Sequence, residues 1–415
     1  MPNQNNVVKF QRPVQRAPVR LFNWLARTLG SHADLSEEGL CRAACRSTRL
    51  DDFGEDGFRE PLRVLLRSLE EEADLHPFGR LFARSLVLRC LVNRLKLTAD
   101  WKRWPQILDE EVRGPVFVLG LPRCGTTLMH NLLAADPASR SPAYWEAHDL
   151  SPPPARDSYA TDPRRRRARI EVRVLDYLVP NLLAMHEISA EGPEECYALL
   201  ANAFAGVQFS WMFDVPGFND WLSGRDMRDS YRYYRKQLQL LQWRCPGDRW
   251  VLKSPTHLWT ADALLAVFPD ARIVQIHRDP LKVVASACSL GATMRGLTSR
   301  DVALHDLGRK ATEGLATGVG KCTAARAAAP AGQFLDLHYL EFVRDPLATV
   351  RGVYNHFDMP FTAQAEAAVK AALARHPQNK RGAHRYTLEQ FGLNADEERC
   401  RYAVYCETYG VQREA

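Results

Sequence analysis

Long apolar runs and paired cysteine motifs are missing from this sequence of 415 residues. No apolar run reaches the roughly eighteen residues of a transmembrane helix, and the first residues lack the apolar centre of a secretory signal. The ten cysteines are scattered, without a CxxC pair or the Cys/His spacing of a zinc site. We therefore interpret them as reduced thiols of a cytoplasmic protein and predict no metal site.

Charge is moderate, with 25% charged residues and a net charge of +6. This excess does not indicate nucleic acid, and it suits a small polyanionic ligand or an acidic membrane surface. The one dense run, residues 164–167 (RRRR), is interpreted as a solvated helix face, with steering of an anionic substrate or membrane as the alternative. A basic amphipathic stretch at residues 19–29 either packs on the domain or contacts a membrane surface. The oligomeric state is left open.

The apolar pattern changes along the chain. Residues 35–110 show three- and four-residue spacing, which predicts a helical N-terminal region. Short apolar runs then alternate with helical patterns, predicting buried strands at 116–119, 250–252, 272–276 and 334–338. The predicted fold is therefore α/β, a P-loop-like parallel sheet flanked by helices, preceded by an all-helical region. Ligands of such sheets bind at the carboxyl ends of the strands.

A candidate anion-binding loop, residues 120–127 (GLPRCGTT), joins the first predicted strand to a helix. The first N–H groups of a helix lack partners, and its dipole attracts anions. Gly125 allows close approach of the backbone, Thr126 and Thr127 add hydroxyl donors, and Arg123 adds a planar cation. The spacing resembles a Walker A loop, but Thr126 stands where that motif has lysine. The loop is predicted to hold one phosphate well and a triphosphate poorly.

Three stretches resemble enzymes that depend on 3′-phosphoadenosine 5′-phosphosulfate (PAPS): VFVLGLPRCGTTLMHNLLAADP, RWVLKSPTHLWTADALLAVFPDARIVQIHRDPLKVVASACSL and RYTLEQFGL. They are similar to the sulfotransferase group that includes tyrosylprotein sulfotransferases and bacterial small-molecule sulfotransferases. The resemblance spans about residues 114–392 and implies a sulfotransferase domain at 111–392. The residue pattern outside it predicts a partly loose segment at 1–34, a helical region at 35–110 and a packed C-terminal helix at 393–415. The resemblance also implies in-line transfer of sulfonate from PAPS to a hydroxyl of a small molecule or lipid, without a metal.

The resemblance also assigns donor-binding residues. The loop that holds the 5′-phosphosulfate maps onto Arg123, Cys124, Gly125, Thr126 and Thr127. The 3′-phosphate is expected at Arg278 and Ser286, and the adenine near Tyr339. A late basic segment is expected to close over the 3′-phosphate through Arg381, with Arg375, Lys380 and Arg385 as alternatives.

Catalysis needs cations at the leaving group and a base for the acceptor hydroxyl. Arg123 and Lys253 are the predicted cations, and Lys253 matches a family lysine that contacts the leaving-group oxygen. The resemblance to tyrosylprotein sulfotransferases makes Glu146 the leading candidate base, and His257 and His186 are the alternatives. Residues 145–245 are expected to form the acceptor wall, and packing in the core is the alternative role of their aromatic side chains: Trp145, Tyr159, Tyr177, Phe204, Phe209, Trp211, Phe213, Phe218 and Trp221.

Two other functions fit parts of the sequence. A kinase with an atypical phosphate loop would bind ATP with magnesium, which the missing Walker lysine argues against. A nucleotide-binding protein without catalysis would not need Lys253 or the candidate bases. A nucleic-acid binder is least favoured, because the sequence has no concentrated Lys/Arg and aromatic surface motif beyond the single arginine run.

Overall fold

The computed structural model describes residues 7–9, 15–30, 32–179, 182–185, 187–375 and 383–414. Its central element is a five-stranded parallel sheet, as predicted. The strands lie in the order β3 (Ser139–Arg140), β4 (Arg249–Lys253), β2 (Val116–Gly120), β5 (Arg272–His277) and β6 (Phe334–His338). A separate pair joins β1 (Val7–Lys9) to β7 (Ala383–Arg385).

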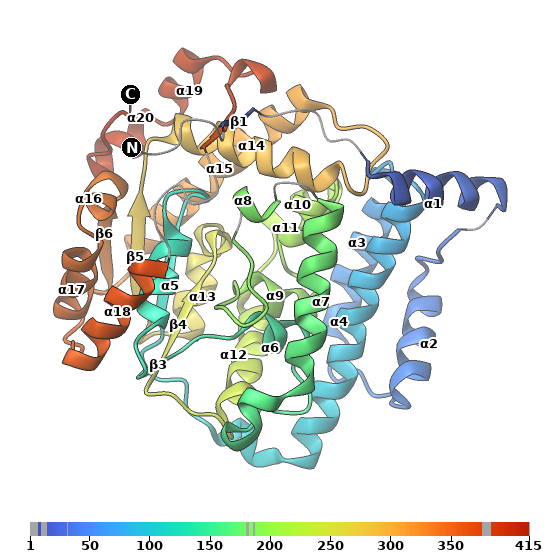
Figure 1. The fold of residues 1–415 in the computed structure, drawn as a ribbon, viewed down its shortest axis with the longest axis horizontal. Coiled ribbons are helices and arrows are strands. Elements are labelled where there is room, and N and C mark those ends of the chain that lie inside the picture. Colours follow the sequence, from blue (N-terminus) through green and yellow to red (C-terminus); the bar gives the residue numbers. More distant parts are fainter. Residues whose placement is uncertain are drawn as a thin grey trace.

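Helices surround this sheet, and the N-terminal ones lie beside it as a helical group (Figure 1). The N-terminal helices are α1 (Ala17–Thr28), α2 (Glu37–Thr48), α3 (Arg59–Glu71) and α4 (Pro77–Arg103). The helices between β2 and β4 are α5 (Thr126–Ala134), α6 (Tyr144–His148), α7 (Pro163–Leu178), α8 (Leu182–Met185), α9 (Tyr197–Leu200), α10 (Gln208–Met212), α11 (Pro216–Ser223) and α12 (Arg228–Gln242). The later helices are α13 (Ala261–Val267), α14 (Pro280–Arg295), α15 (Leu304–Arg326), α16 (Tyr339–Arg344), α17 (Pro346–His356), α18 (Ala363–Arg375), α19 (Ala395–Arg401) and α20 (Ala403–Tyr409).

Short polar residues start the helices that follow the strands. Asp279 accepts a hydrogen bond from the N–H of Leu281 at 3.0 Å, and Pro280 takes the first position of α14. Asp345 starts α17 in the same way. These caps satisfy N–H groups that have no partner within the helix, and proline costs nothing there. The C-terminal segment differs from the single helix expected, because it is divided into α19 and α20 at Tyr402.

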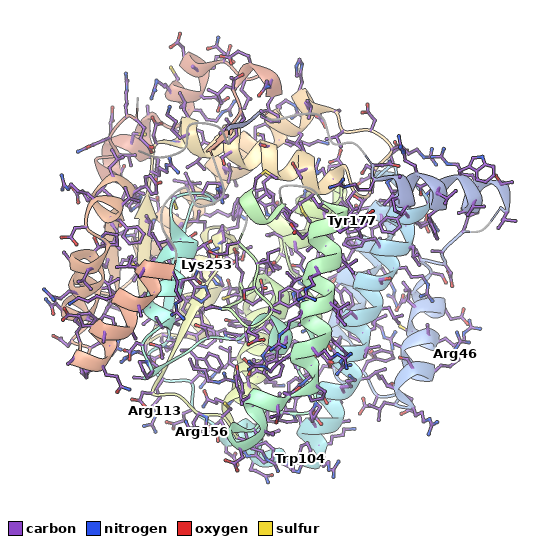
Figure 2. The ribbon with its side chains drawn as sticks, in the orientation of Figure 1. Arg46, Trp104, Arg113, Arg156, Tyr177 and Lys253 are labelled. Carbon is purple, nitrogen blue, oxygen red and sulfur yellow. The ribbon has the colours of Figure 1, made fainter. Side chains whose placement is uncertain are left out.

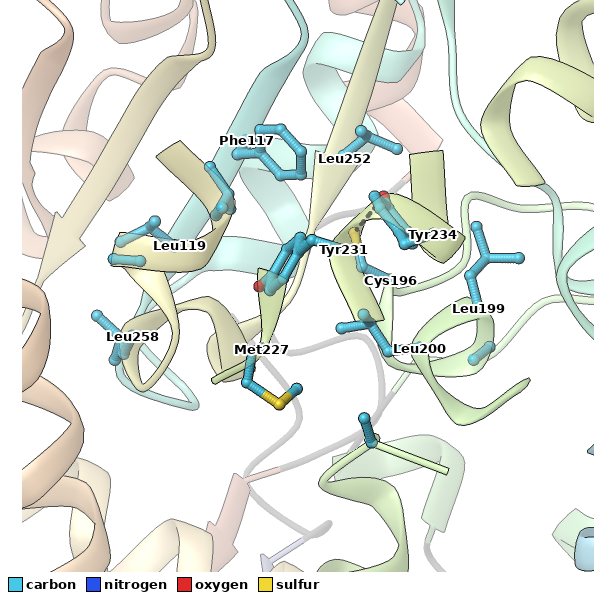
Figure 3. Close-up of a cluster of buried hydrophobic side chains, with 14 of the residues drawn as sticks. Phe117, Leu119, Cys196, Leu199, Leu200, Met227, Tyr231, Tyr234, Leu252 and Leu258 are labelled. Atoms are coloured by element: carbon cyan, nitrogen blue, oxygen red, sulfur yellow. Dashed lines mark hydrogen bonds between the residues drawn. The ribbon is translucent and has the colours of Figure 1, made fainter. Parts of the chain in front are cut away.

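The main core lies on the face of the sheet where strand side chains pack against α12. Phe117 of β2 and Leu252 of β4 are fully buried and belong to the same cluster as Tyr231 and Tyr234 (Figure 3). The buried hydroxyl of Tyr234 donates to the sulfur of Cys196 at 3.2 Å. This packing holds β2 and β4 in place, and so positions the residues at their carboxyl ends. Among the described residues, no helix is long and apolar enough to span a bilayer.

Candidate active site

The sheet order places the predicted binding residues at one edge. β2 lies between β4 and β5, so the loop that follows it lies between Lys253, the last residue of β4, and Arg278, which follows β5. Tyr339 follows β6 in the next position. Figure 2 shows Lys253 in the interior of the molecule. Four segments distant in the sequence therefore converge where parallel sheets bind their ligands.

The geometry of the loop requires its two glycines. Gly120 has φ +150°, and a Cβ there would lie 2.5 Å from the carbonyl oxygen of Ile276. Gly125 has φ +90° directly before α5, and its Cβ would lie 3.2 Å from the Tyr339 ring. The thiol of Cys124 donates to the carbonyl of Leu121 at 2.7 Å, and burial raises its pKa to about 12. Cys124 therefore turns its side chain to the core, and only its backbone is left to face a ligand.

Arg123 links the loop to the predicted 3′-phosphate site. Its Nε donates to the hydroxyl of Ser286 at 3.3 Å, and its Nη1 donates to the carbonyl of Met185. Its own backbone carbonyl accepts from Nη1 of Arg278 at 2.7 Å. The residues expected at the two phosphates of the donor are therefore in direct contact through Arg123.

Arg278 is held by an aromatic ring and a carboxylate. Its guanidinium lies 3.8 Å from the centroid of the Tyr339 ring. Its Nε and Nη2 donate to the two carboxylate oxygens of Glu414 at 2.8 and 2.9 Å. Two parallel bonds of this kind are the geometry in which arginine also binds phosphate. The guanidinium is thus oriented to grip a planar pair of anionic oxygens.

Lys253 lies beside the loop with a carboxylate partner that the sequence did not identify. Its Nζ donates to Oγ1 of Thr127 at 3.1 Å and forms an ion pair with Glu195. The side chains of Lys253 and Glu195 are 3% and 10% exposed. Next to them, burial raises the pKa of Glu194 to about 7. The ammonium of Lys253, the carboxylate of Glu195 and the hydroxyl of Thr127 therefore lie together at a site that is largely excluded from solvent.

Glu146, the leading candidate base from the sequence, does not reach this position. Its side chain is fully buried in an ion pair with Arg140 at 2.7 Å. The same carboxylate accepts from the N–H of Ala143 at 2.8 Å and from the hydroxyl of Tyr159 at 3.0 Å. These contacts fix the turn before α6, so the structure gives Glu146 a structural environment instead of a reactive one.

His257, the first alternative base from the sequence, is not at the site either. His257 is buried in the core, where its Nδ1 lies 2.6 Å from the hydroxyl of Tyr231 and its ring packs edge-on against Phe117. Burial lowers its pKa to about 3. The remaining candidate base, His186, lies outside the described residues. So do Lys380 and Arg381, while the side chain of Arg385 is not described.

A cavity of about 860 Å³ opens from the loop. One end is lined by polar residues already described: Arg123, Gly125, Thr126, Thr127, Glu195, Lys253, Arg278 and Tyr339. The rest of the cavity is mostly apolar and lies between α4, α7, α10 and α14, lined by Phe78, Phe82, Leu86, Ile170, Val174, Leu175, Leu178, Phe209, Trp211, Met212, Leu290 and Met294. The polar side chains of Arg89, Asn93, Glu171 and Gln208 also line it. The volume is in the range of small-molecule binding sites.

The composition of the apolar wall corrects the sequence prediction. Of the nine aromatic residues expected there, only Phe209 and Trp211 line the cavity. Phe204, Phe213 and Phe218 are core residues packed against the N-terminal helices. The opposite wall comes from α4, which no sequence motif connected with the site. Glu195 was also missed, and its only signal was its place in an acidic run after Gly192-Pro193.

Comparison with known proteins decides the family, since a sequence profile described as the sulfotransferase family matches residues 115–363. The chain belongs to the sulfotransferase family. This sulfotransferase is similar to the crystal structure of sulfotransferase STF9 from Mycobacterium avium, with a TM-score of 0.85, 31% identity, and coverage of 92% of this chain and 98% of that chain. Sulfotransferase STF1 from Mycobacterium tuberculosis H37Rv matches with a TM-score of 0.77 and 33% identity, over 89% of this chain and 98% of that chain.

A functionally named relative is also similar. The omega-hydroxy-beta-dihydromenaquinone-9 sulfotransferase Stf3 of Mycobacterium bovis is 26% identical over 323 residues, which is 72% of this chain and 76% of that protein. The match to STF9 covers 92% of this chain, and the uncovered part is shorter than the segment from α2 to α4. The structural likeness therefore includes at least part of these N-terminal helices. This enzyme is therefore a sulfotransferase whose likeness to known structures includes part of the helical group beside the sheet.

Proposed function

We propose that this sulfotransferase moves the sulfonate of PAPS to a hydroxyl at the end of a long apolar molecule. The observation that carries the proposal is a cavity in which the loop of residues 120–127 meets a mostly apolar wall. Such a cavity brings an anionic donor and an apolar acceptor to one point, where Lys253 and Glu195 lie together.

The residues at the polar end fit the anionic groups of the donor. The first N–H groups of α5 and the hydroxyls of Thr126 and Thr127 suit the 5′-phosphosulfate. Arg278 and Ser286, both in contact with Arg123, suit the 3′-phosphate. The carboxylate of Glu414 on Arg278 is an anion in the position expected for that phosphate. Adenine would lie near Tyr339, as in the family pattern.

Bond exchange at sulfur follows from this arrangement. PAPS supplies an activated sulfonate whose leaving group is a stable phosphate. The acceptor oxygen forms a bond to sulfur while the bond from sulfur to the 5′-phosphate oxygen breaks, and the hydroxyl proton passes to the carboxylate of Glu195. Lys253 and Arg123 neutralise the negative charge that moves to the leaving phosphate. We assign the base role to Glu195 because it lines the cavity beside Lys253, whereas Glu146 is bound to Arg140.

The acceptor is proposed to be a lipid or another extended apolar alcohol. Aliphatic, aromatic and methionine side chains line its part of the cavity, so each methylene group that leaves water contributes about 0.8 kcal/mol. The menaquinone derivative in the name of the Mycobacterium bovis relative is an extended apolar alcohol of this kind. We also propose a cytoplasmic location, where the ten cysteines, all free thiols in the structure, would stay reduced.

The proposal is tested by supplying PAPS with primary alcohols of increasing chain length and measuring product formation. kcat/KM is expected to rise about fourfold with each added methylene group until the cavity is filled. Leu290→Trp, which narrows the apolar part, is expected to shift the optimum to shorter alcohols. Equal rates for short and long alcohols would contradict the assignment of the apolar wall.

A further inference from the structure

Exposed apolar side chains are concentrated on two neighbouring helices. Among the described residues, twelve large hydrophobic side chains are exposed, and eight of them lie on α1, on the residue just after it, or on α7. We call these eight the α1–α7 patch: Leu21, Phe22, Trp24, Leu25, Leu29, Ile170, Val174 and Tyr177. A soluble monomer normally scatters such residues singly, so a cluster of this size indicates a contact surface.

Helix α1 presents its apolar face outward. Val19 and Ala26 are buried against the protein, while Trp24 is 62% exposed and Leu29 is 76% exposed. Figure 1 shows α1 extending away from the main body at the edge of the molecule. A helix that packs only on its own domain would direct these larger side chains inward. The sequence favoured domain packing over membrane contact for residues 19–29, whereas the observed orientation favours membrane contact.

The inner contacts of α1 place it at the apolar end of the cavity. The Asn23 side chain accepts from the N–H of Phe78 at 2.8 Å, and the rings of Phe22 and Phe78 lie 5.9 Å apart, edge to face. Phe78 is itself part of the cavity wall. On the other side, Arg16 donates to the carbonyl of Tyr177 at 3.2 Å. Helix α1 therefore bridges the start of α4 and the end of α7.

The exposed stripe of α7 continues the same surface into the cavity. Ile170 and Val174 are 52% and 50% exposed, and both also line the cavity. Tyr177 follows one turn later at 55% exposure, and Figure 2 shows it at the end of α7 next to α1. One face of these side chains is thus in water and the other belongs to the acceptor site.

Charge distinguishes between possible occupants of this surface. Helix α1 and the residue before it carry Arg16, Arg20 and Arg27 and no acidic residue. Neither Arg20 nor Arg27 forms an ion pair with any residue that the structure describes. A second copy docked through the same helix would bring these like charges together, whereas an anionic lipid surface neutralises them. Exposed tryptophan and phenylalanine beside arginine are also typical of a helix that lies in the bilayer interface.

We propose that the α1–α7 patch docks the enzyme on an anionic bilayer, with the cavity mouth against the lipid. Docking would let the apolar acceptor pass from the bilayer along Ile170 and Val174 without crossing water. This role for the surface deepens the proposed function, because it identifies the bilayer as the source of the acceptor. Binding to the bilayer itself requires neither donor nor acceptor, so it can be tested separately.

The experiment is flotation of the full chain with vesicles of phosphatidylcholine alone or mixed equally with phosphatidylglycerol. The wild type is expected to float with the mixed vesicles and more weakly with phosphatidylcholine. Trp24→Glu/Leu29→Glu should lower the partition coefficient onto the mixed vesicles at least tenfold. Arg20→Gln/Arg27→Gln should lower this coefficient by about fivefold per arginine. Val404→Glu is the matched control, because Val404 is 76% exposed like Leu29 but lies on α20.

Three results would overturn the proposal. The first is a wild type that does not bind the mixed vesicles but still binds 3′-phosphoadenosine 5′-phosphate (PAP), which would leave the proposed function standing. The second is a loss of binding in Val404→Glu as complete as in the α1 variant. The third is a wild-type dimer in sedimentation that Trp24→Glu/Leu29→Glu converts to a monomer, which would make the patch an interface between copies.

Discussion

Exchanging two glutamates one at a time separates the base from the structural carboxylate. Glu195→Gln removes a carboxylate that lines the cavity beside Lys253. A positioned general base contributes about 10²- to 10⁴-fold to the rate, so kcat should fall by that amount. PAP binding should be unchanged or tighter, because a negative charge near the phosphates is lost.

Glu146→Gln should instead lower the stability of the fold and leave kcat nearly unchanged. The Arg140 and Glu146 side chains are 8% and 0% exposed, so the variant leaves a buried guanidinium without its counter-charge. Breaking a buried pair on one side costs about 3–5 kcal/mol. The unfolding entropy of a chain of 415 residues is about 0.9 kcal/mol/K, so Tm should fall by about 3–6 °C. At temperatures well below the Tm of the variant, its kcat should stay within about threefold of the wild-type value.

The assay is PAP release with a long-chain alcohol, measured together with calorimetric unfolding and PAP titration of each variant. The reasoning is refuted if Glu195→Gln keeps its kcat while folded Glu146→Gln loses more than about a hundredfold. That result would return the base role to Glu146 and would require α6 to rearrange when the donor binds. Lys253→Met serves as a comparison, since it should lower kcat without creating a new base.

Two further variants test charges at the site. Glu414 pairs with Arg278, which we propose binds the donor. Glu414→Gln should therefore tighten PAP binding by about two- to fivefold in a titration, while Glu407→Gln on α20 should not; equal affinities would contradict competition between Glu414 and the donor. Glu194 has a pKa raised by burial to about 7 from an ordinary 4.5, so its stabilising effect is complete below about pH 4.5 and is lost as the pH rises through 7. The stability of the wild type relative to Glu194→Gln should therefore fall by about 3 kcal/mol between pH 4.5 and 8, and a pH-independent difference in denaturant midpoints would contradict it.

The sheet and its loops were predictable because their signals are local. Buried parallel strands appear as continuous apolar runs, and Asp279-Pro280 marks the start of a helix without any knowledge of the fold. The loop chemistry of residues 120–127 follows from glycine, threonine and arginine placed between a strand and a helix. Convergence of Lys253 and Arg278 then follows from the rule for the carboxyl ends of parallel strands.

The acceptor side was not predictable, because tertiary packing decides it. The family resemblance and the nearby loop favoured Glu146 as the base, and only the structure reveals that its carboxylate is paired with Arg140. The pattern of aromatic residues could not separate Phe209, on the cavity, from Phe213, in the core. The wall formed by α4 depends on how the N-terminal helices dock, for which residues 77–103 carry no motif.

The most direct test of the central claim is a calorimetric titration of the enzyme with PAP in EDTA, alongside ATP with magnesium and the Arg278→Ala/Ser286→Ala variant. Tight binding of PAP without metal, lost in the variant and stronger than binding of ATP, is the predicted result. Binding of magnesium–ATP without binding of PAP would contradict the donor assignment, and with it the roles given to the loop, Arg278 and Ser286.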